Sequence, residues 1–120
     1  MNENNKLIAK FMGGNYISKE FFNNGAWDLK EHHGYQPILY YNFSWDWLIP
    51  VIDKIESLNF IVEIKQNTCI IKSSFLGNKL SLTKQIYNYK KEYTKLSNTY
   101  KSVIEFINWY NKINNEKKNF

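Results

Sequence analysis

Residues 44–65, SWDWLIPVIDKIESLNFIVEIK, contain the transition that decides the fold, because the spacing of the apolar residues changes within them. Up to Leu58 the apolar residues recur every three or four positions, which is the period of a helix with one buried face. From Phe60 onward apolar and charged residues alternate, which is the period of a half-buried strand. The stretch therefore predicts a helix over residues 45–58 that leads directly into a strand.

Local signals mark the start of this helix. We expect Ser44 to cap the first free N–H groups, and Asp46 in the first turn complements the helix dipole. Phe43 is expected to pack on Leu48 in a hydrophobic staple. Pro50 lies beyond the first turn, so it removes one backbone hydrogen bond and is expected to bend the helix.

After the first strand, Gln66-Asn67 predicts a turn and residues 69–71 a returning strand. The segment 80–96 fits two structures. Apolar residues spaced by four and three from residue 82 to residue 110 are typical of one long heptad helix. We favour instead a third strand over residues 84–91, because its aromatic residues prefer strands.

The two ends of the chain are expected to be helical. Ser97-Asn98-Thr99 resembles a cap, so the last helix is predicted from about residue 98 to residue 115, with an unusually wide apolar arc. A short helix near the N-terminus is predicted after a cap at Asn4 or Asn5, and Gly13-Gly14 ends it. Residues 15–43 show no period and are predicted to be irregular, with a short extended piece at residues 38–41.

These elements predict an α+β fold, with a small antiparallel meander of two or three strands packed against flanking helices and the C-terminal helix on the sheet. With 120 residues, 43% of them hydrophobic, the chain is expected to form a single domain over residues 1–120. The sequence lacks an apolar run long enough to cross a bilayer, and the single Cys69 has no partner for an internal disulfide. We therefore expect a cytoplasmic protein.

Charge is distributed unevenly along the chain. Residues 1–63 carry 5 Lys and 8 acidic residues, a net charge of −3, whereas residues 64–120 carry 11 Lys and 3 acidic residues, a net charge of +8. All 16 basic residues are Lys, so sequence-specific reading of a DNA duplex through bidentate Arg contacts is disfavoured. AT-rich coding also enriches Lys and Asn. The Lys content therefore has two explanations, genome composition and selection for positive charge.

The basic half interleaves lysines with aromatic residues, the combination that binds single-stranded nucleic acid by stacking and charge neutralisation. If residues 84–91 form a strand, Tyr87 and Tyr89 share a face. The alternative is a half-buried strand with a solvated lysine edge. The candidate residues for binding a partner or nucleic acid are Lys84, Tyr87, Tyr89, Lys90, Lys91, Tyr93, Lys95 and Trp109, with Trp47 as a candidate anchor that the core competes for.

Catalytic and metal sites are disfavoured. The one cluster with ligand chemistry is Asp28, Glu31, His32 and His33, and adjacent histidines diverge, so surface polar residues in a loop are the preferred interpretation. Neither Ser18 nor Ser44 has a nucleophile motif around it, and Cys69 in an apolar strand is expected to be buried. No glycine-rich loop precedes a helix to hold phosphate. We expect no enzyme activity, cofactor or metal.

Three segments resemble a family of small uncharacterised proteins of bacteriophages and prophages. They are residues 5–13 (NKLIAKFMG), 44–56 (SWDWLIPVIDKIE) and 103–111 (VIEFINWYN), about a third of the chain. The family has no catalytic residues to carry over. The resemblance implies a mobile genetic element, an AT-rich bacterial host and helices flanking a small sheet.

The expected function is therefore non-enzymatic binding. A phage accessory protein of this kind would inhibit or redirect a host protein or ribonucleoprotein, such as a CRISPR effector, in the host cytoplasm, as an anti-CRISPR-like inhibitor does. The first alternative is a single-stranded RNA- or DNA-binding protein that uses the Lys- and Tyr-rich half. The second is an oligomeric structural phage component that uses the heptad run.

Overall fold

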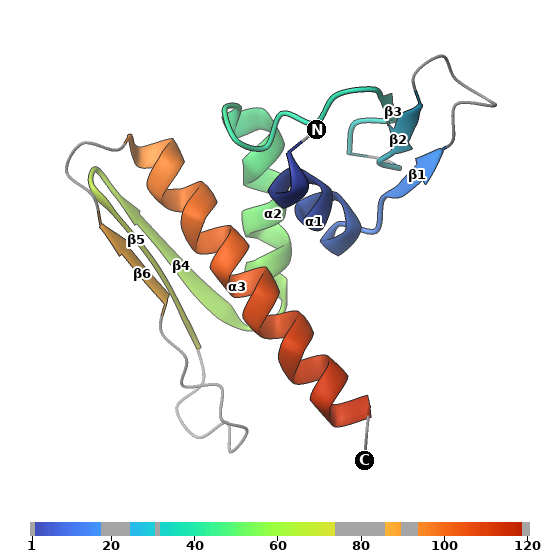
Figure 1. The fold of residues 1–120 in the computed structure, drawn as a ribbon. Helices are drawn as coiled ribbons and strands as arrows, with labels where there is room; N and C mark the ends of the chain where they lie inside the picture. Colours follow the sequence, from blue (N-terminus) through green and yellow to red (C-terminus); the bar gives the residue numbers. More distant parts are fainter. Residues whose placement is uncertain (1, 18–24, 31, 74–85, 90–93, 119–120) are drawn as a thin grey trace.

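The computed structural model describes residues 2–17, 25–30, 32–73, 86–89 and 94–118. Its strands form two antiparallel three-stranded sheets, β1–β2–β3 and β4–β5–β6, on opposite sides of the helices (Figure 1). The predicted α+β class is confirmed. The elements in chain order are α1 (Glu3–Phe11), β1 (Asn15–Ile17), β2 (Ala26–Asp28), β3 (Tyr35–Gln36), α2 (Trp45–Ser57), β4 (Phe60–Lys65), β5 (Thr68–Ser73), β6 (Ile86–Tyr89) and α3 (Lys95–Lys118).

Helix α2 begins where the sequence predicts, but the predicted side-chain cap by Ser44 is wrong. Ser44 is extended, with φ −137° and ψ 121°, and its side chain makes no capping hydrogen bond. The carbonyl oxygen of Ser44 accepts hydrogen bonds from the N–H groups of Trp47 and Leu48. The predicted staple is wrong, because a turn closed by the Phe43 N–H and the Tyr40 carbonyl directs Phe43 toward Tyr40. Phe43 is consequently 60% exposed.

The predicted hairpin is confirmed. Asn59 adopts φ 72°, a left-handed conformation that Asn tolerates better than most residues, and so turns the chain from α2 into β4. Strands β4 and β5 then pair from Phe60↔Ser73 to Lys65↔Thr68. The paired residues enclose the predicted turn at positions 66 and 67.

The strand predicted over residues 84–91 is present as β6, which is shorter and pairs with β5 from Ile71↔Ile86 to Thr68↔Tyr89. A continuous heptad helix from residue 82 to residue 110 is therefore wrong. The apolar spacing arises because β6 and α3 each bury one face, with their separate periods joined by coincidence. The argument for an oligomeric structural component, which depended on that helix, loses its basis.

Helix α3 is longer than predicted, since it starts at Lys95 and ends at Lys118. The cap is Thr94, whose hydroxyl oxygen accepts a hydrogen bond from the Ser97 N–H at 3.1 Å. Asn98 and Thr99 lie inside the helix and are buried. The predicted start at about residue 98 is therefore wrong, because this polar stretch lies inside the helix and two of its members are buried in the first turns.

The N-terminal third has more order than predicted. Helix α1 is capped by Asn2, whose side chain accepts from the Asn4 N–H, so the predicted cap at Asn4 or Asn5 is wrong. Residues 15–43 contain β1, β2 and β3, which are two or three residues long and too short to show a period. Residues 38–41 are not a strand.

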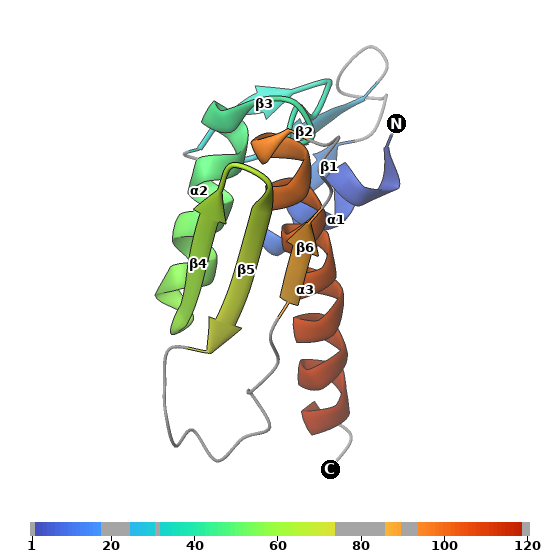
Figure 2. The same cartoon turned by 90° about the vertical axis from the view of Figure 1, so that its left-hand side faces the viewer.

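The core lies where the three helices meet the two sheets. Helix α3 packs on one face of β4–β5–β6, and Figure 2 shows the other face in front of the helices with no described helix over it. No described helix is long and apolar enough to span a membrane. The largest fully buried apolar side chains are Phe106, Ile8, Leu48, Ile55, Ile71, Ile107, Val51 and Val103.

A buried asparagine joins three parts of this core. The Asn5 side-chain amide donates to the Leu39 carbonyl oxygen at 3.0 Å and to Asn42 Oδ1 at 2.9 Å. The Tyr100 hydroxyl donates to Asn5 Oδ1 at 2.8 Å. Asn5 therefore connects α1, the segment before α2, and α3 through hydrogen bonds that satisfy its buried side chain.

Candidate binding surface

The sheet β4–β5–β6 has one buried and one open face. In β4, Phe60, Val62 and Ile64 pack into the core. In β5, Cys69 and Ile71 do the same. The intervening positions belong to the other side. We define the open face as Ile61, Glu63 and Lys65 of β4, Thr68, Ile70 and Lys72 of β5, and the positions of Tyr87 and Tyr89 in β6.

The strand register brings these positions into rows across the sheet. Glu63 pairs with Ile70, and Ile70 pairs with Tyr87. Thr68 lies between Lys65 and Tyr89 in the same way. For Tyr87 and Tyr89 the structure describes the backbone alone, and their positions alternate with the buried Ile86. The expectation that the two tyrosines share a face therefore holds for their positions in the strand.

The described part of the open face is mixed in character. Ile61 is 38% exposed and Ile70 is half-buried, so apolar surface is accessible beside charged groups. Lys72 and Glu63 form an ion pair at 3.1 Å, and the side chains of both are partly exposed. Such a surface pair contributes little to stability, about 0–1 kcal/mol. Lys65 is exposed and adds a positive charge that this pair does not neutralise.

The other predicted binding residues are only partly brought together. Lys84, Lys90, Lys91 and Tyr93 lie outside the described residues. Lys95 is exposed at the first position of α3.

Trp109 does not belong to the open face. Its ring contacts Phe60 and Phe106, each with ring centroids 5.9 Å apart. Because Phe60 belongs to the buried face, Trp109 lies on the α3 side of the sheet, half-buried at the edge of the core.

Trp47 is a core residue and not an exposed anchor. It is 9% exposed, and the His33 ring stacks on it with centroids 4.1 Å apart and planes at 9°. Tyr40 and Tyr41 meet the same indole edge-on, at 5.4 and 5.1 Å. The segment before α2 folds over the first turn of the helix, which a helical wheel cannot show. Burial also raises the pKa of Tyr41 to about 12.

The described residues considered for metal binding or catalysis make contacts within the fold. Asp28 accepts the Lys30 N–H at 3.0 Å, and burial against Trp47 lowers the pKa of His33. No group of three metal-binding side chains occurs among the described residues, a set that excludes Glu31. Cys69 is buried as predicted, and burial raises the pKa of its thiol.

Sequence reasoning missed a second accessible surface around the start of α2. Tyr35, Ile38, Phe43 and Ile49 are each between 44% and 60% exposed. Ile49 follows the spacing of the acidic residues of α2 and not that of Leu48 and Ile52. A helical wheel of α2 alone would have separated the two faces.

Comparisons of the chain with models of protein families, with curated proteins and with solved structures find no match.

Proposed function

We propose that the protein is a non-enzymatic binding protein that attaches to a host protein or ribonucleoprotein through the open face and inhibits or redirects it. One observation carries this proposal: a sheet covered by helices on one side presents apolar, tyrosine and lysine positions together on the other. Accessible apolar groups beside charged ones are typical of interaction sites.

Electrostatics favours an anionic partner surface. The half of the chain that contains β5, β6 and α3 carries a net charge of +8 within residues 64–120. Lysines act as point charges, so they accelerate encounter with an acidic or phosphate-rich surface without demanding one geometry. A ribonucleoprotein supplies both phosphates and protein surface.

The proposed setting is a bacteriophage or prophage, with the protein acting in the cytoplasm of its bacterial host. The support is the resemblance of residues 5–13, 44–56 and 103–111 to small phage proteins. A CRISPR effector is a candidate partner in that setting, since it presents both RNA and protein.

A direct single-stranded RNA- or DNA-binding function is the second candidate. The strand register favours it, because Tyr87 and Tyr89 occupy alternate positions on the same side of β6. Two aromatic residues on one face of a sheet are an arrangement that stacks successive bases.

The decisive experiment is capture of partners from a host lysate by the purified protein, with and without nuclease and at low and high salt. We expect a discrete protein that survives nuclease and that is lost in the variant Lys90→Glu with Lys91→Glu, and weakened by Lys65→Glu. The matched control reverses two exposed lysines of α1 and α3, Lys10→Glu with Lys112→Glu, and should retain the partner.

Recovery of nuclease-sensitive, salt-labile material alone would favour the second candidate. Partner binding that is unchanged both in Lys65→Glu, which alters the open face itself, and in the Lys90 and Lys91 variant would refute the assignment of the surface.

A further inference from the structure

Helix α2 exposes an acidic face that is separate from the open face of the sheet. Asp46, Ile49, Asp53 and Glu56 are spaced by three, four and three residues, so they lie along one side of the helix. All four are exposed. At 1.5 Å per residue, the ten-residue interval from Asp46 to Glu56 is roughly 15 Å long. We call these four residues the acidic face of α2.

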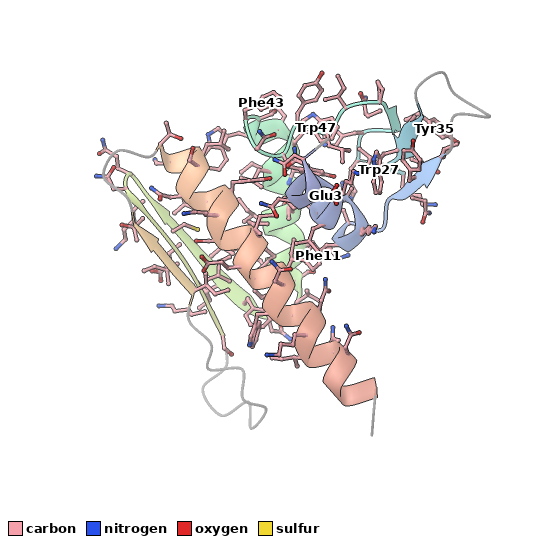
Figure 3. The ribbon with its side chains drawn as sticks, viewed as in Figure 1. Glu3, Phe11, Trp27, Tyr35, Phe43 and Trp47 are labelled. Carbon is pink, nitrogen blue, oxygen red and sulfur yellow. The ribbon has the colours of Figure 1, made fainter. Side chains whose placement is uncertain are left out.

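Apolar surface continues from this face across the start of the helix. Phe43 lies just before α2, and its ring packs edge-on against Tyr40 with centroids 5.2 Å apart. Tyr40 in turn contacts the buried Trp47, so the Phe43 ring packs on a side chain that is itself packed against the core. Figure 3 shows Phe43 and Tyr35 along the same edge of the molecule, away from the C-terminus.

The positive charge that would balance the acidic face is directed elsewhere. Lys54 is the one lysine of α2, and its Nζ donates to the Phe11 carbonyl oxygen and lies 4.6 Å from the centre of the Phe11 ring. Among the described residues none of the three carboxylates forms an ion pair. The face therefore carries three negative charges around an exposed isoleucine.

The three negative charges and the exposed apolar side chains together decide which class of partner this surface can bind. Nucleic acid and anionic lipid would be repelled by the carboxylates. A second copy of the chain is disfavoured, because the exposed side of α3 carries Lys101, Glu105, Asn108 and Lys112, with no apolar residue to cover Phe43 and Ile49. A helix that matches α2 needs apolar residues at helical spacing and lysines or arginines beside them.

We propose that the acidic face of α2, together with Phe43, binds a basic amphipathic helix of a partner protein. Apolar residues of that helix cover Phe43 and Ile49, and its basic residues face Asp46, Asp53 and Glu56. This surface is independent of the one in the proposed function, because the open face consists of positions in β4, β5 and β6 and shares no residue with it.

The test uses two synthetic 18-residue helical probes, one of Leu and Lys with all Leu on one side, and the same peptide with Glu in place of Lys. Binding is measured by fluorescence anisotropy, and the contacted residues by amide chemical-shift changes in the labelled protein. We expect the Lys probe to bind at least about tenfold more tightly than the Glu probe, a difference of about 1.4 kcal/mol. The shifted amides should lie within residues 43–56.

Two variants test the two halves of the surface. Phe43→Ser with Ile49→Ser removes the apolar part, and Asp53→Lys with Glu56→Lys reverses the charge; each should weaken the Lys probe about tenfold or more. Ile61→Ser, an exposed isoleucine on the open face, is the matched control and should leave binding unchanged. Equal binding of both probes, unchanged binding in the two variants, or shifts confined to β4 and β5 would overturn the proposal.

Discussion

Replacing Tyr100 by Phe should destabilise the protein by breaking the hydrogen bonds around Asn5. Asn5 is 2% exposed, and its Oδ1 accepts a hydrogen bond from the Tyr100 hydroxyl at 2.8 Å. The Asn5 amide stays bonded to Leu39 and Asn42 after the substitution, so Asn5 Oδ1 is the buried group that loses its partner. The substitution also removes the exposed hydrogen bond that the Asn2 side-chain amide donates to the Tyr100 hydroxyl at 3.2 Å. Leaving a buried acceptor without its donor costs about 1–3 kcal/mol, whereas the ring is retained and packing changes little.

We therefore expect a loss of about 1–2 kcal/mol for Tyr100→Phe. Asn5→Ala should cost more, about 3 kcal/mol, because it also leaves the buried Leu39 carbonyl oxygen and Asn42 Oδ1 without this donor. If the two residues act through one hydrogen bond, Tyr100→Phe in the Asn5→Ala background should cost little, since the acceptor is already gone.

Urea unfolding followed by circular dichroism measures these free energies for the single and double variants. Tyr16→Phe, a change in a 53% exposed tyrosine of β1, is the control and should stay within about 0.5 kcal/mol of the parent protein. Strict additivity of Tyr100→Phe and Asn5→Ala, or a Tyr100→Phe variant as stable as the parent, would refute the reasoning.

Three further outcomes are expected. Lys54→Met should lower stability by about 1 kcal/mol in urea unfolding, because it keeps the apolar stem but removes the hydrogen bond to Phe11 at the end of α1, whereas the exposed Lys65→Met should have no effect. Burial lowers the pKa of His33, although Asp46 opposes this, so the unfolded state binds the proton more readily, and stability should fall as pH decreases below about 6.5. Unfolding measured from pH 8 to pH 5 should show a smaller fall in His33→Phe, which keeps the stack on Trp47. His32→Gln should reduce the fall less, because the charge of His32 also lowers the pKa of His33, although burial is the larger cause. The Cys69 thiol should react with a chromogenic disulfide reagent at the rate of unfolding, faster in urea, and a rapid reaction of the native protein would contradict its burial.

The elements that could be predicted from the sequence are those whose own length shows a period. Helix α2 has 13 residues, enough to show the helical spacing of 3.6. Strands β4 and β5 have six residues each, enough to show the strand spacing of 2. Strands β1, β2 and β3 have two or three residues, and tertiary contacts such as the burial of Trp27 accompany their pairing.

The candidate surfaces were predictable to different degrees. The side of β6 that carries Tyr87 and Tyr89 followed from the alternation of a strand once the strand was assumed. The burial of Trp47 did not follow, because the residues that cover it, His33 and Tyr41, come from a segment without a period. The same segment turns Phe43 outward, so the error about the staple and the missed exposed surface have one cause.

The structure also bears on whether the lysine content records only AT-rich coding. A coding bias acts along the whole chain, so by itself it predicts similar charge in both halves and lysines at any exposed position. Residues 1–63 instead have a net charge of −3 and residues 64–120 a net charge of +8. On α2 the exposed positions hold Asp46, Asp53 and Glu56, while its one lysine bonds to the end of α1. A coding bias alone does not predict this separation of charge, whereas the two proposed binding surfaces of opposite charge would account for it.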